Sequence, residues 1–247
     1  MSTLRHATQT YIMNFSIADK LQNVRKRIQK ATIDAGLAEN SVQLLAVSKK
    51  KPAEAVFELF KQGQKIFGEN YLNEALEKQI AVKALLTKEG NAEDIVWHFI
   101  GPIQSNKTRP IAESFTWVHS VDRIKIAQRL NDQRPDTLSP LNICIQVNID
   151  EEETKSGILL SDLPELCRAL EDMPRLKLRG LMCIPQANQS EESLSTAFTK
   201  MKSAFNDLQE SYSSVDTLSM GMSGDMEQAI ACGSTMVRVG TALFGER

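Results

Sequence analysis

The chain has 247 residues, a formal net charge of -2 and a charged fraction of 24%. This length suits one large α/β domain or two small ones, and the near-neutral charge without a basic block argues against a nucleic-acid partner. No apolar run approaches the roughly 20 residues of a membrane-spanning helix. The four cysteines lie far apart, which argues against a zinc site and a disulfide framework and favours the cytoplasm.

The N-terminal region is expected to contain a loose extension followed by one extra helix. Residues 1–16 lack the long apolar core of a signal peptide. Apolar residues then recur at three- and four-residue spacing over 17–36, which predicts an amphipathic helix that ends at Gly36. We expect residues 17–247 to form a single domain, with nothing in the composition to divide it.

Apolar runs of strand length alternate with helical patterns along the rest of the chain. Strands are predicted at 43–48, 66–68, 95–100, 115–119, 141–149, 176–184, 217–220 and 235–239. Helices are predicted at 52–62, 71–88, from 105 or 106 onward, 121–130, 163–173, 191–211 and 225–231. This alternation implies parallel strands joined by crossovers.

Eight such units in about 250 residues predict an α/β fold of the TIM-barrel type, (β/α)8. The alternative is an open doubly wound sheet. That fold usually has fewer strands and a glycine-rich first turn, and residues 49–53 contain no glycine.

The loops that follow the strands of a TIM barrel gather on one face, where its chemistry takes place. Lys49 ends the first predicted strand, and Asn70 follows the second. The segment 220–224, Met-Gly-Met-Ser-Gly, leads from the seventh strand into a helix, and Gly240 and Thr241 follow the eighth. Free N–H groups at helix starts attract anions, and the last two loops of a barrel often hold a phosphate.

Four of the candidate residues, including Arg238 in the eighth predicted strand, also have an ordinary structural interpretation. Lys49 could be a solvated lysine at a strand end, and Ser223 and Asn70 could each cap the helix that follows. Arg238 could pair with a carboxylate in the barrel. The residues predicted to follow the strands at this face contain no cluster of carboxylates and no group of histidines, so a metal hydrolase is not expected.

A lysine, a phosphate site and Arg238 together suggest pyridoxal 5'-phosphate (PLP). A lysine amine can form a Schiff base with an aldehyde. An arginine that faces the ring nitrogen is no acid and would leave that nitrogen unprotonated, which makes the cofactor a weaker electron sink.

Several segments, in order, carry a resemblance to a known family. They are LLAVSK (44–49), FGENY (67–71), WHFIGPIQSNK (97–107), IQVNI (145–149) with KSG (155–157), RGLMCIP (179–185), LSMGMSGDMEQAI (218–230) and GSTMVRVGTALFG (233–245). The chain resembles the pyridoxal phosphate homeostasis protein family, a single-domain relative of the alanine racemase barrel, over about residues 17–246.

The resemblance implies a role for each matching residue. Lys49 would form the Schiff base with PLP, and Arg238 would face the pyridine nitrogen. The remaining residues implied to contact the cofactor are Asn70 beside it, Met182 and Met222 as pocket lining, and Ser223, Gly240 and Thr241 around the phosphate. Position 224 departs from the family, which more often has an aspartate where this chain has glycine.

The family resemblance implies a PLP carrier in vitamin B6 homeostasis and amino-acid balance, without strong enzymatic activity. Alanine racemases use a second base, a tyrosine from a further domain, and this chain ends shortly after its eighth predicted strand. None of Tyr11, Tyr71 and Tyr212 is predicted at a strand end. We expect a monomer, with PLP-dependent enzymes as possible clients.

Two other functions stay open at this point. A weak amino-acid racemase would need a second base near the pocket, for which Lys107, His119 and His98 are the candidates. A barrel that binds another phosphate ester without covalent chemistry would not need Lys49.

Overall fold

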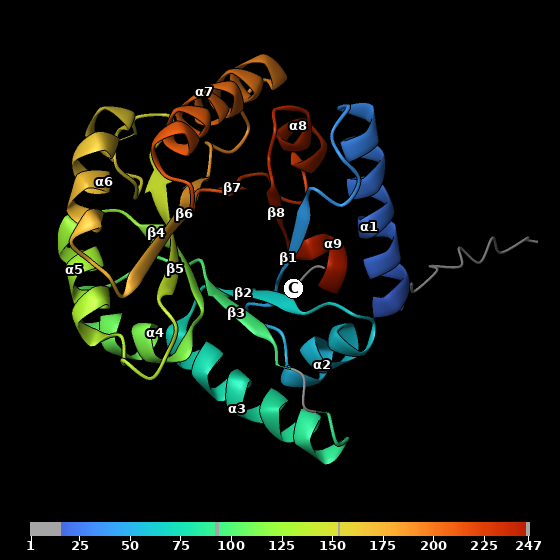
Figure 1. Cartoon of the computed structure of the whole chain (residues 1–247). Helices are drawn as coiled ribbons and strands as arrows, with labels where there is room; N and C mark the ends of the chain where they lie inside the picture. Colours follow the sequence, from blue (N-terminus) through green and yellow to red (C-terminus); the bar gives the residue numbers. More distant parts are fainter. Residues whose placement is uncertain (1–15, 92–93, 153, 246–247) are drawn as a thin grey trace, which may run out of the picture.

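The computed structural model describes residues 16–91, 94–152 and 154–245. Eight parallel strands, paired in sequence order, close into a barrel that is surrounded by helices (Figure 1). The strands are β1 (Gln43–Val47), β2 (Ile66–Glu69), β3 (Val96–Phe99), β4 (Trp117–Val121), β5 (Leu141–Val147), β6 (Leu176–Cys183), β7 (Thr217–Ser219) and β8 (Met236–Val239).

The helices follow the strands in alternation. They are α1 (Ile17–Asp34), α2 (Ala53–Lys61), α3 (Leu72–Lys88), α4 (Thr108–Ser114), α5 (Ile124–Gln133), α6 (Leu163–Glu171), α7 (Glu191–Ser211), α8 (Met226–Ala231) and α9 (Thr241–Phe244). Two short 3-10 helices, η1 (Ser105–Lys107) and η2 (Leu160–Asp162), precede α4 and α6.

Pairing of the first and last strands decides between the two predicted architectures. β1 and β8 run parallel in register from Gln43 opposite Met236 to Ala46 opposite Val239. An open doubly wound sheet would leave two edges, so this closing pair confirms the TIM barrel. The carboxyl ends of all eight strands therefore meet at one mouth.

Helix α1 is the predicted extra helix and covers the seam where the barrel closes. Ser16 and Asp19 form a capping box, in which the Asp19 backbone N–H donates to Ser16 Oγ at 3.1 Å. The buried residues of α1 pack together with residues of α2, α8 and α9, as its position beside these helices in Figure 1 shows. Apart from Ser16, the predicted extension 1–16 lies outside the described residues.

Most of the apolar core lies between the strands and the surrounding helices. Inside the barrel, Leu45, Ile100 and Met236 form a small apolar cluster of their own. Burying a polar side chain is costly unless it is hydrogen-bonded. The buried polar side chains of β3, β4, β7 and β8 must therefore find partners across the barrel, and they form a hydrogen-bonded chain that is described below.

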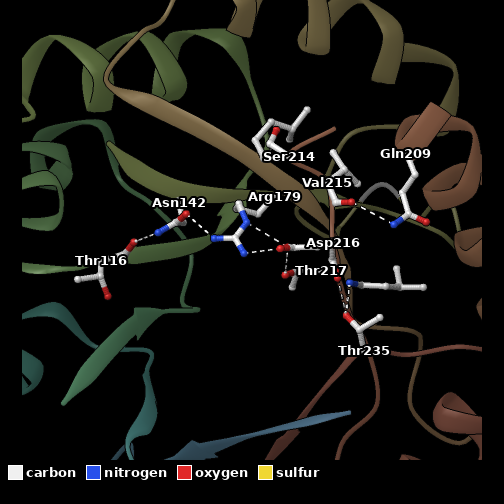
Figure 2. A network of polar contacts seen from close by, with 11 residues as sticks. Thr116, Asn142, Arg179, Gln209, Ser214, Val215, Asp216, Thr217 and Thr235 are labelled. Atoms are coloured by element: carbon white, nitrogen blue, oxygen red, sulfur yellow. Dashed lines mark hydrogen bonds and ion pairs between the residues drawn. The ribbon is translucent and has the colours of Figure 1, made fainter. Parts of the chain in front are cut away.

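A polar network closes the opposite, amino-terminal end of the barrel. The guanidinium of Arg179 pairs with the Asp216 carboxylate, with Nε 3.0 Å from Oδ1, and donates to Asn142 Oδ1 at 2.7 Å (Figure 2). It also lies 4.5 Å from the centroid of the Trp117 ring. These contacts join β4, β5, β6 and the residue before β7, and they belong to the face of a TIM barrel that contributes to stability.

The structure differs from the sequence predictions mainly at element boundaries. The fourth strand begins at Trp117 rather than at residue 115, and α5 begins at Ile124 rather than at 121. Helix α9 was not predicted, because four residues are too few for a periodic pattern. In the described part of the chain, no helix combines the length and apolar character needed to cross a bilayer.

Candidate functional site at the carboxyl mouth of the barrel

Lys49 lies two residues beyond the end of β1 and is half-buried. The backbone N–H of Ser48 donates to Gly68 O of the neighbouring strand at 3.0 Å, so the chain remains bound to the barrel as far as Ser48. Lys50 then takes a left-handed backbone conformation, with φ of 59°. Such a conformation is strained for a residue with a side chain, and it turns the chain sharply after Lys49.

The loop that contains Gly240 and Thr241 lies beside this turn. Ala46 of β1 pairs with Val239 of β8, and a Cβ atom on Gly240 would lie 3.2 Å from Val47 O. Helix α9 begins at Thr241, so its first N–H groups have no partner within the helix. The backbone of Lys49 and one half of the predicted phosphate site therefore lie on adjacent loops.

Lys51 fixes α9 against the loop after β1. Its Nζ donates to Phe244 O at 3.3 Å and to Gly245 O at 3.2 Å, at the carboxyl end of α9. A cation at that end also interacts favourably with the helix dipole. This contact could not be predicted from the sequence, because α9 is too short to show a periodic pattern.

The loop after β7 supplies the other half of the predicted phosphate site. Gly221 has φ of 92°, and a Cβ there would lie 2.5 Å from the Ala229 Cβ of α8. The Arg238 backbone N–H donates to Gly221 O at 3.0 Å, which joins this loop to β8. Helix α8 begins at Met226, with Asp225 at its N-cap position, so the interpretation of Ser223 as an ordinary helix cap is wrong.

The guanidinium of Arg238 is buried within the barrel, and 4% of the residue's surface is exposed. NH1 donates to Ser219 O at 2.6 Å and to Ser219 Oγ at 2.9 Å, and NH2 donates to Cys183 O at 2.8 Å. The alternative that Arg238 pairs with a carboxylate is therefore wrong, since these partners are uncharged. Burial lowers the pKa of Arg238, but an arginine remains a hydrogen-bond donor at any physiological pH.

A chain of hydrogen bonds continues from Arg238 into the barrel interior. His119 Nδ1 lies 3.0 Å from Ser219 Oγ, and His119 Nε2 lies 2.8 Å from His98 Nδ1. Burial lowers the pKa of His119 to about 3 and that of His98 well below its ordinary value, so both rings are neutral. Because Arg238 donates to Ser219 Oγ, the serine hydroxyl is free to donate to His119.

Neither histidine is placed to act as a second base at the mouth. Both rings are buried. The sequence predicted His119 at the end of the fourth strand, whereas it lies in the middle of β4. The third candidate, Lys107, is half-buried in η1.

Asn70 and the two methionines occupy different depths at the mouth. Asn70 follows β2, and its Oδ1 is buried without a hydrogen-bond partner among the described residues. Its interpretation as a helix cap is wrong, because Tyr71 is the N-cap residue of α3. Met182 is fully buried in β6 opposite Ser219, whereas Met222 is 38% exposed at the rim.

Tyr71 corrects one expectation about the tyrosines. It lies two residues beyond the end of β2, is 47% exposed, and has its ring centroid 5.7 Å from Lys50 Nζ. The sequence analysis assigned no tyrosine to a strand end, because Tyr71 was predicted to lie inside the helix that follows. One phenol is thus present at the mouth.

The cysteines of the barrel are free thiols. The described residues contain no group of three or more His, Cys, Asp or Glu side chains that could hold a metal ion. Cys144, Cys167 and Cys183 are buried and Cys232 is half-buried, and none forms a disulfide. Burial raises the pKa of Cys183 to about 12 and that of Cys167 to about 11, so these thiols are not reactive nucleophiles.

Comparison with known proteins identifies the family. The family model of the alanine racemase N-terminal domain matches residues 20–247. The pyridoxal phosphate homeostasis protein of Pseudomonas aeruginosa is 52% identical over 94% of this chain and 96% of that protein. The protein of the same name from Escherichia coli strain K12 is 49% identical over 94% of this chain and 97% of its own.

The chain belongs to the pyridoxal phosphate homeostasis protein family. This confirms the resemblance that the sequence motifs carried.

Solved structures agree with this assignment. The structure of PipY from Synechococcus elongatus PCC7942 with PLP bound has a TM-score of 0.77 and 34% identity, and covers 93% of this chain and 100% of that chain. Alanine racemase from Clostridium difficile 630 has a TM-score of 0.68 at 15% identity, and this chain covers 57% of it. That likeness shows a shared barrel fold alone.

Proposed function

We propose that this protein binds PLP covalently through Lys49 and takes part in PLP homeostasis. The observation that carries the proposal is that Lys49 lies beside the Gly240–Thr241 loop, with the buried Arg238 guanidinium on the neighbouring strand. It is supported by the relatives named pyridoxal phosphate homeostasis protein and by the PipY structure with PLP bound.

The residues at the mouth fit this cofactor. The first N–H groups of α9 suit an anion. Gly221 and Gly240 let the two loops pack closely against Ala229 and Val47. Asn70 Oδ1 is a buried acceptor without a hydrogen-bond partner among the described residues. We propose that Ser223, Gly240 and Thr241 hold the phosphate, that Asn70, Met182 and Met222 surround the ring, and that Arg238 faces its nitrogen.

When bound, PLP would supply an aldehyde with which the Lys49 amine could form a Schiff base, with loss of one water. The chain's own residues set how strongly the ring withdraws electrons. Arg238 donates hydrogen bonds but no proton, so the ring nitrogen stays unprotonated and electron withdrawal stays weak. This suits a protein that holds PLP more than one that rearranges amino acids on it.

The proposed role is that of a cytoplasmic carrier that keeps vitamin B6 and amino-acid pools balanced. Free, unreactive cysteines support a reducing compartment. We propose that the protein acts as a monomer and that PLP-dependent enzymes are its clients.

The test compares wild type with Lys49→Ala after PLP is added, followed by borohydride reduction and intact-mass measurement. We expect wild type to gain the mass of one reduced pyridoxyl phosphate, and Lys49→Ala to gain none. A wild type that binds no PLP would overturn the proposal. PLP binding that survives in Lys49→Ala at wild-type affinity would instead support a barrel for phosphate esters without covalent chemistry.

The position of Tyr71 supports an alternative function, that of a weak amino-acid racemase. Its exposed phenol lies at the same mouth as Lys49 and could return a proton to the opposite face of a substrate. Exchange of the α-hydrogen of L-alanine in D2O, followed by chiral analysis, measures this activity. Racemisation that is lost in Tyr71→Phe would support the second candidate, and its absence in wild type would exclude it.

A further inference from the structure

A buried lysine on α3 makes contacts that the cofactor site does not account for. Lys78 is 5% exposed, and its Nζ donates to Ser48 O at 2.7 Å, Glu69 Oε1 at 2.7 Å and Glu74 Oε1 at 2.8 Å. An ammonium group has three N–H donors, so all three are used. Ser48 Oγ donates to the same Glu69 oxygen at 2.6 Å, which joins the loop after β1, the end of β2 and α3.

This cluster binds both peptide groups that flank Lys49. On one side, the Ser48 carbonyl accepts from Lys78 Nζ. On the other side, the Lys50 backbone N–H donates to Glu74 Oε1, the same oxygen that Lys78 holds. The backbone of Lys49 is therefore held at both ends by one ammonium and the carboxylate paired with it.

The cluster also sustains the strained turn. Lys50 has φ of 59°, which costs on the order of 1–2 kcal/mol for a residue with a Cβ. Such a conformation persists only when its surroundings hold it, and the Glu74 carboxylate on the Lys50 N–H does so.

Stability alone is a poor reason for these charges. Removing a lysine and a carboxylate from water is costly, and apolar residues of similar volume often stabilise a core as well or better. Glu69 is fully buried, burial raises its pKa, and its Oε2 has no partner among the described residues. Burying these charges costs free energy, and one carboxylate oxygen has no hydrogen-bond partner among the described residues. We therefore expect the cluster to serve the position of the backbone it binds rather than stability alone.

We propose that Lys78, with Glu74 and Glu69, is a positioning device that holds the Lys49 backbone so that its amine reaches the cofactor aldehyde. This inference rests on the proposed attachment of PLP to Lys49. None of the three residues is proposed to touch PLP. A displacement of about 1 Å at a reacting group can cost about 100-fold in rate, so loss of the cluster should slow attachment.

The experiment measures the rate at which PLP becomes trappable by borohydride in Lys78→Met, Glu74→Ala and Glu74→Gln. We expect Lys78→Met and Glu74→Ala to slow attachment and weaken PLP affinity by about 10-fold or more. Glu74→Gln keeps an oxygen that accepts from the Lys50 N–H, so it should recover most of the rate. Thermal unfolding of both variants is measured beside the rate. A merely structural role would slow attachment only as far as the 31% exposed Glu74 side chain contributes to stability, whereas a positioning role slows attachment in a protein that remains folded.

Arg134→Met is the matched control for loss of stability. Arg134 is a 4% exposed cation that donates to the carbonyls of Ala112, Phe115 and Ser139, away from the mouth. It should lower the unfolding temperature without changing the attachment rate.

The outcomes separate this inference from the proposed function. A wild type that traps no PLP overturns the proposed function. A wild type that traps PLP, while Lys78→Met and Glu74→Ala do so at the rate of Arg134→Met, overturns the positioning role alone. If Lys78→Met does not fold, the comparison of Glu74→Ala with Glu74→Gln decides the question.

Discussion

Among single residues, Ser219 accepts hydrogen bonds from the buried Arg238 guanidinium through both its carbonyl and its hydroxyl oxygen. Its Oγ accepts from Arg238 NH1 and lies 3.0 Å from His119 Nδ1. Ser219→Ala would leave two buried polar groups without this partner, and each such group costs about 1–3 kcal/mol. We expect a loss of at least about 1 kcal/mol in the free energy of unfolding, measured by urea denaturation, and weaker PLP binding.

Ser161→Ala is the control for that substitution, because Ser161 is exposed and, among the described residues, its hydroxyl donates only to Asp162. It should stay within about 0.5 kcal/mol of wild type, as surface substitutions usually do. A Ser219→Ala protein as stable as Ser161→Ala would mean that Ser219 does not hold the buried chain.

Residues at strand ends could be predicted from the sequence, whereas partners within the barrel could not. The positions of Lys49 and Arg238 in the barrel could be predicted because an apolar strand pattern ends at the first and contains the second. The roles of Ser219 and Lys78 depend on which side chains face one another across neighbouring elements. That information lies in strand register and helix packing, which one sequence pattern does not contain.

Among the elements, the loop between β7 and α8 depends on one glycine and not on the other. Gly221 has φ of 92°, and its Cβ would lie 2.5 Å from Ala229 Cβ, whereas a Cβ on Gly224 would meet nothing within 4 Å. Gly221→Ala should therefore lose about 1–3 kcal/mol of stability and bind PLP more weakly. Gly224→Ala should match wild type in thermal unfolding and PLP titration, and equal effects of the two substitutions would contradict this account.

Elements with strong patterns could be predicted and short ones could not. All eight strands were predicted because buried parallel strands have continuous apolar runs. Helix α9 was missed because it has four residues, and α3 was predicted to start one residue early, at Tyr71. That one-residue difference placed Tyr71 inside a helix rather than in the loop at the mouth, so a small boundary error changed the interpretation of a candidate site.

At the scale of the whole molecule, the stability of the barrel depends on two histidines that stay neutral inside it. An unfolded histidine has a pKa near 6.5, whereas burial lowers the pKa of His119 to about 3 and also lowers that of His98. Below pH 6.5 the unfolded chain takes up protons that the folded barrel excludes. The free energy of unfolding should therefore fall as pH decreases from about 6.5 toward 3, by up to about 1.4 kcal/mol per pH unit for His119, and His98 acts in the same direction.

His119→Gln isolates this effect from the carboxyl groups. Glutamine keeps a polar group in the buried chain but does not titrate, so the variant should lose less stability than wild type between pH 6.5 and 4.5. The raised pKa of Glu69 acts in the opposite direction, since its contribution to stability decreases as pH rises, but it is common to both proteins and cancels in the difference. Urea denaturation at several pH values gives the two slopes. If the free energy of unfolding changes with pH equally in the two proteins, His119 is charged or solvated in the folded barrel. That result would disprove the neutral hydrogen-bonded chain of Arg238, Ser219, His119 and His98.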